Sequence, residues 1–117
     1  MSHRYPTRFQ AMRLKENKVN HAIDHKNRLA DEVSKVNTYG ERLEKVIQLY
    51  EYVRDTPILM ESVQGFRGDV WEKLNILEEL LIEKSQKLNP FDPYHGTIEF
   101  LILNAMTLID DIRAKYW

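Results

Sequence analysis

Basic side chains recur at intervals of three and four residues in one N-terminal segment: Lys18, His21, His25 and Arg28. On a helix this spacing places all four on one face, and Arg13 and Lys15 extend the basic segment toward the N-terminus. The simplest interpretation of this basic ridge is a solvated face. The second interpretation is that the ridge binds an acidic surface on another protein chain. The third is that it binds nucleic acid: a basic helix can follow phosphates, but this helix has no aromatic side chains that could stack on bases.

His21 and His25 lie one helical turn apart and could together bind one metal ion. The segment from His21 to His25 resembles the His-x-x-Glu-His helix of inverted zinc peptidases, with Asp24 in place of the catalytic glutamate. No third ligand is evident in the chain. We therefore predict no metal site, and we interpret the two histidines as surface residues.

Glutamates on the expected second and third helices form another candidate group: Glu41, Glu44, Glu51, Glu72, Glu79 and Glu83. Carboxylates from facing helices can bind Mg²⁺. Glu41-x-x-Glu44 and Gly68-Asp69-Val70-Trp71 are similar to short motifs of the all-α nucleoside triphosphate pyrophosphohydrolases of the MazG type, although Phe66 stands where that family has an acid. The resemblance implies a Mg²⁺-dependent pyrophosphohydrolase as one alternative function. The simpler interpretation is that these acids face water, opposite the apolar faces of their helices.

Other catalytic signatures are missing from the sequence. It contains no glycine-rich phosphate loop and no serine, histidine and aspartate set of a nucleophile elbow. Because there is no cysteine, disulfides, thiolate metal sites and cysteine nucleophiles are excluded. We predict that the protein is not an enzyme, and we assign it no catalytic residue and no cofactor.

Charge is distributed unevenly along the chain. Residues 1–30 carry seven Lys and Arg against two acids, a formal charge of +5, whereas residues 31–117 carry ten against sixteen, a formal charge of −6. The total of −1 therefore conceals a basic arm and an acidic body. Such asymmetry is typical of a chain that binds a polyanion, a membrane surface or its own acidic half.

The length of 117 residues predicts a single domain. We divide it into a basic N-terminal helix, residues 1–37, and an acidic helical body, residues 38–117. The most apolar stretch, residues 98–109, is shorter than the roughly 18 residues that a membrane span needs, and residues 1–6 do not resemble the start of a secretory signal. We expect a cytoplasmic protein that does not interact with membranes.

Apolar residues follow helical spacing almost everywhere, which predicts an all-α bundle of about four helices. We expect a long N-terminal helix or helical hairpin, a short helix over residues 58–64, and a helix over 70–88 capped by Asp69. We expect a last helix to begin at Thr97, and because its segment 98–109 is apolar almost all round, it should be the central, most buried element. Apolar residues follow an unbroken heptad spacing from Leu29 to Tyr50, which leaves open whether residues 8–54 form one helix or two. Because residues 38–41 have the form of a capping box, we favour a kink or a short break at residues 37–40.

The N-terminal helix carries only a thin apolar stripe: Phe9, Met12, Val19, Ile23, Leu29, Val33 and Val36. A helix with so narrow a stripe is stable only when it packs on something, so we predict pairing with a second copy, as in a coiled coil, or with a partner's groove. The predicted function is a small self-associating interaction protein that binds a protein partner: an adaptor, inhibitor or assembly factor, as phages and mobile elements encode. A nucleic-acid-binding module using the ridge with Arg4 and Arg8 is the first alternative, and the pyrophosphohydrolase is the second.

Overall fold

The computed structural model describes residues 7–117, and all regular secondary structure in that range is helical. Five helices follow one another: α1 (Arg8–Lys35), α2 (Tyr39–Asp55), α3 (Pro57–Ser62), α4 (Phe66–Gln86) and α5 (His95–Tyr116). The prediction of an all-α fold with a long N-terminal helix is confirmed. None of the helices combines the length and the apolar character that a membrane crossing requires, within the part of the chain that is described.

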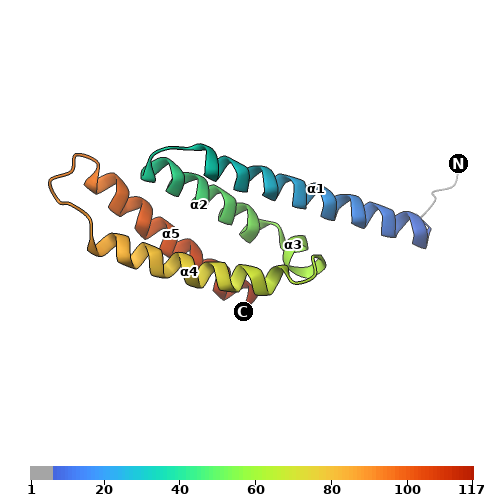
Figure 1. Cartoon of the computed structure of the whole chain (residues 1–117). Coiled ribbons are helices and arrows are strands. Elements are labelled where there is room, and N and C mark those ends of the chain that lie inside the picture. Colours follow the sequence, from blue (N-terminus) through green and yellow to red (C-terminus); the bar gives the residue numbers. More distant parts are fainter. Residues whose placement is uncertain (1–6) are drawn as a thin grey trace, which may run out of the picture.

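Two antiparallel hairpins pack side by side (Figure 1). The first consists of α1 and α2, the second of α4 and α5, and α2 packs against α5 where the hairpins meet. The short helix α3 connects them and contacts both α1 and α4. The result is elongated, with extents of 70 × 27 × 23 Å, because α1 continues well beyond the other helices (Figure 1).

The predicted break between the first two helices is confirmed. Lys35 ends α1, and Thr38 caps α2 by accepting a hydrogen bond from the backbone N–H of Glu41 at 3.2 Å. One continuous helix over residues 8–54 is therefore wrong. The apolar spacing through this region belongs to two helices that fold back on each other, so it does not mark one long coiled-coil seam.

Two helix starts differ from the sequence-based expectation. The N-cap of α4 is Gly65, whose φ of 79° is the left-handed conformation that glycine adopts most easily, so Asp69 lies in the first turn rather than at the cap. Its carboxylate remains near the positive end of the helix dipole there. The last helix begins at His95, two residues before the predicted cap Thr97.

The core is apolar, and α5 supplies the largest share of it. Its buried residues are Ile102, Ala105, Leu108, Ile109 and Ile112, whereas α1 buries only Ala22. No polar or charged side chain is buried among residues 7–117. The expectation that the segment 98–109 belongs to the most buried element agrees with the share of the core that α5 supplies, although Phe100 and Leu103 within it are 63% and 59% exposed. They lie on the face of α5 that is turned away from α2 and α4.

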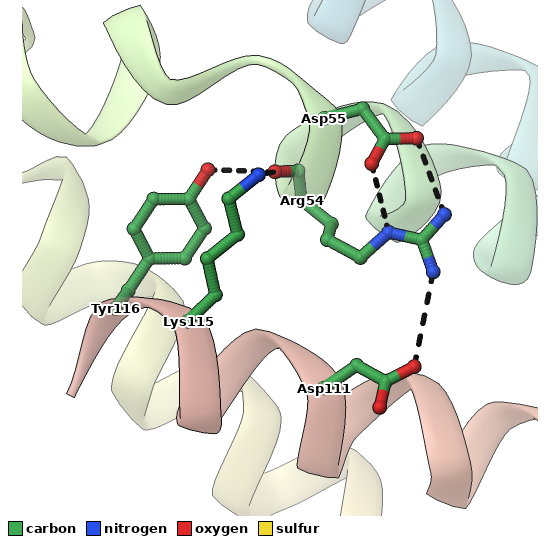
Figure 2. A network of polar contacts seen from close by, with 5 residues as sticks. All are labelled: Arg54, Asp55, Asp111, Lys115 and Tyr116. Carbon is green, nitrogen blue, oxygen red and sulfur yellow. Dashed lines mark hydrogen bonds and ion pairs between the residues drawn. The ribbon is translucent and has the colours of Figure 1, made fainter.

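Polar contacts join the ends of α2 and α5 (Figure 2). The backbone carbonyl of Arg54, in the last turn of α2, accepts hydrogen bonds from the Tyr116 hydroxyl at 2.6 Å and the Lys115 ammonium at 2.9 Å. The Arg54 guanidinium meanwhile binds Asp55 at 2.8 Å and lies 3.9 Å from Asp111. The last turn of a helix leaves carbonyls without helical partners, so α5 provides a tertiary cap for α2.

Candidate functional site

The N-terminal part of α1 extends beyond α2, its partner in the hairpin. With 28 residues against 17, α1 is about 16 Å longer than α2 at the usual helical rise. Cross-hairpin contacts set the register: Glu32 lies 3.6 Å from Lys45, and the ring of His25 lies 4.3 Å from that of Tyr52. The same register brings Ala22 beside the end of α2. Everything N-terminal to Ala22 therefore extends past α2.

Helix α3 is the next neighbour of α1 beyond the end of α2. Between it and α1 lies an open groove lined by Met12, Lys15, Glu16, Val19, Asn20, Glu61 and Ser62. Every residue from Thr7 to Lys18 is exposed, including Phe9 at 66%, Met12 at 58% and Leu14 at 54%. We call residues 8–18 the arm; Figure 1 shows it as the blue end of α1 that runs on past α3.

The arm is both apolar and strongly basic. Its charged residues are Arg8, Arg13, Lys15, Lys18 and Glu16, a formal charge of +3. None of them forms an ion pair with a described residue. The Arg13 guanidinium lies 5.1 Å from the centre of the Phe9 ring, a cation–π contact on the open surface. Arg4, which the nucleic-acid alternative would also use, lies outside the described residues.

The arm stays helical because its start is well capped. The Thr7 hydroxyl accepts a hydrogen bond from the backbone N–H of Gln10 at 3.1 Å, and the Gln10 side chain accepts one from Thr7 at 3.0 Å. This reciprocal capping box satisfies donors that the first turn would otherwise leave free. Local hydrogen bonds thus support a segment that has little tertiary packing.

Packing of α1 on α2 covers part of the basic ridge and leaves the rest exposed. Lys18, His21 and Arg28 are exposed, but His25 is half-buried against Tyr52, and its Nδ1 accepts a hydrogen bond from Arg28 at 2.8 Å. The four residues therefore do not form the free face, opposite the packed side of the helix, that the sequence predicts. The reason is that the packed face of α1 is centred on Ala22 rather than on the apolar stripe.

The predicted oligomer interface is divided in the same way. Val19, Ile23, Leu29, Val33 and Val36 are half-buried, and α1 packs on α2 and α3 of its own chain. Only Phe9 and Met12 of the predicted set remain fully available. Leu14, Phe100 and Leu103 are exposed apolar residues that the sequence analysis did not assign to a surface. The predicted helix lengths already contained a signal for the arm, because a helix from residue 8 cannot be covered by a partner that ends near residue 55.

The carboxylates of the pyrophosphohydrolase alternative lie apart. Glu41 and Glu44 line a pocket of about 420 Å³ beside Asp92 and Tyr94, at the end of the molecule where α5 begins. Glu79, by contrast, is an exposed residue in the middle of α4. Within residues 7–117 no three His, Asp or Glu side chains are grouped closely enough to hold a metal ion. The geometry therefore gives this alternative no assembled site.

Comparisons with protein-family models, with curated proteins and with solved structures find no match for this chain. The surfaces of the molecule are therefore the basis for assigning its function.

Proposed function

We propose that the protein is a self-associating helical interaction protein, active in the cytoplasm, that binds a protein partner through the arm of α1. The observation that carries the proposal is the exposure of Phe9 and Met12, which share one face of a capped helix that extends beyond its own fold. Exposed apolar groups that are close together and surrounded by charge are typical of interaction sites. A helix that lays an apolar stripe into a partner's groove is a common mode of recognition.

Nucleic acid explains the arm less well. Its basic residues suit phosphates, but Phe9 and Met12 share a face with Glu16 by helical spacing, and that face offers an apolar contact rather than a row of cations. The aromatic platform for single-stranded bases would consist of Phe9 alone within the arm. A protein surface that is apolar in the centre and acidic at its edges matches both features.

Site-specific photocrosslinking in the native host tests the proposal. A photoreactive amino acid at Phe9 or Met12 is expected to give a discrete adduct with a protein, resistant to nuclease. The same group at Glu72, an exposed residue of α4, is the matched control and is expected to give little or none. Adducts that nuclease removes would support the nucleic-acid alternative instead, and equal adducts at both sites would exclude a role for the arm.

A further inference from the structure

The outer face of α5 has the opposite chemistry to the arm. Phe100 and Leu103 are exposed at its centre, and Glu99, Asp110 and Asp111 are exposed along the same face. No Lys or Arg occurs between Lys87 and Arg113, so residues 95–112 carry a formal charge of −3. We call the exposed face of residues 99–111 the acidic strip.

The arm and the acidic strip match in length and in pattern. Residues 8–18 span about 16 Å of helix, and residues 99–111 span about 20 Å. Each presents two large apolar side chains three residues apart, Phe9 with Met12 and Phe100 with Leu103. In each, charged residues lie on both sides of the apolar pair by helical spacing. The formal charges of the two segments, +3 and −3, are opposite in sign; Asp111 of the strip also lies 3.9 Å from the Arg54 guanidinium of its own chain.

These two surfaces do not meet within one chain. α1 packs on α2 and α3, whereas α5 packs on α2 and α4. The arm projects from the α3 end of the molecule (Figure 1). Phe9 and Phe100 are 66% and 63% exposed. Two apolar faces that remain open on the same protomer favour a contact between protomers.

We propose that the arm of one protomer docks on the acidic strip of a second copy of this chain. This inference rests on the proposed function, because it names the partner of the same arm. Pairing of two arms with each other is disfavoured, since it would oppose two surfaces that each carry +3. A reciprocal exchange, in which each arm lies on the other protomer's strip, repeats one contact twice and closes a symmetric dimer.

Paired charge reversal tests the contact. Reversal of the arm in R13E/K15E, or of the strip in E99K/D110K, is expected to raise the dissociation constant of the dimer by about tenfold or more, because like charges then face each other. Sedimentation velocity over a range of protein concentrations measures this constant. A chain carrying all four substitutions restores opposite charges and is expected to recover most of the lost affinity. Recovery also shows that the single reversals had not unfolded the protein.

Matched controls carry the same charge changes on exposed residues of α4 and on its C-cap residue, Lys87. E72K/E79K repeats the reversal of the strip at exposed acids, and K73E/K87E repeats that of the arm. Both are expected to leave the dissociation constant within about twofold of the parent, since surface charges outside an interface contribute little. Raising the ionic strength is expected to weaken the parent dimer, because exposed charge pairs are screened.

Each other outcome overturns the docking of arm on strip. A parent chain that remains at 14.0 kDa at high micromolar concentration excludes the second copy. The arm can then still bind a different protein, which the crosslinking experiment reveals separately. A dimer that R13E/K15E strengthens would show pairing of arm with arm. Failure of the four-substitution chain to recover would show that arm and strip do not face each other.

Discussion

At the scale of single residues, exposure separates leucines that the sequence makes equivalent. Leu74 is fully buried in α4, Leu77 is half-buried, and Leu103 is 59% exposed on α5. We expect Leu74→Ala to reduce the free energy of unfolding by about 2–5 kcal/mol, the range for a core leucine. Leu103→Ala is expected to change it by less than about 1 kcal/mol. Urea unfolding measures both, and equal losses would mean that the outer face of α5 is buried.

The sequence could not separate these residues because α5 is apolar on most of its circumference. Periodicity identifies a core face only where polar residues mark the opposite side. Phe100 and Leu103 are apolar residues on the side of α5 where polar residues would be expected, so they hide the boundary of the core face. They are also the residues that make the strip a candidate interface. An apolar residue on the solvent side of a helix thus looks like core until its neighbours are known.

Tyr50 gives a prediction for alkaline pH. Burial raises the pKa of its phenol above the ordinary value, because the ionised form loses its solvation. The folded pKa is therefore above the unfolded one, near 10. Its stabilising contribution is complete below that pH and is lost as the pH rises through the folded value. Tyr50→Phe should abolish this loss of stability at alkaline pH. It should also remove one late step from the absorbance titration at 295 nm. An unchanged titration would contradict the assignment, and urea-unfolded protein provides the reference.

At the scale of elements, local sequence signals predicted some of the helix boundaries, whereas tertiary packing determined which helices contact each other. The cap at Thr38 and the stop before Pro57 are visible without a structure, and both mark real helix boundaries. The heptad that crosses Thr38 left one continuous helix possible, because the same spacing suits both a single helix and two helices folded against each other. Which side of α1 faces α2 depends on the turn between them, and periodicity alone did not determine it.

The tertiary cap on α2 is expected to behave cooperatively. Tyr116→Phe removes one of two donors to the Arg54 carbonyl and should destabilise the protein by about 0.5–1.5 kcal/mol. Lys115→Met should cost more in the Tyr116→Phe background than in the parent, because the carbonyl then loses both side-chain donors. A double-mutant cycle by urea unfolding measures the coupling. Effects that add within about 0.3 kcal/mol would show that the two donors act independently.

At the scale of the whole molecule, the structure places the basic and acidic segments of the sequence on separate surfaces. The basic arm is the end of a helix that extends beyond the rest of the fold, and the acidic strip lies on a helix of the other hairpin (Figure 1). The sequence analysis included the acidic half of the chain among the candidate partners. It could not show that the arm and the acidic strip stay apart within one protomer, because that depends on the register of α1 against α2 and on which face of α5 is left open.

Footprinting at two protein concentrations addresses the whole assembly. When the dimer forms, hydroxyl radicals should oxidise Met12, Phe100 and Leu103 more slowly than in the monomer, because both apolar pairs become covered together. Phe91 is 92% exposed in the loop before α5, outside the arm and the strip, and it should react at the same rate in both states. Mass spectrometry of proteolytic fragments gives the rates. Protection of Met12 without protection of Phe100 would place the arm on another surface, whereas protection of all four residues would indicate general aggregation rather than docking.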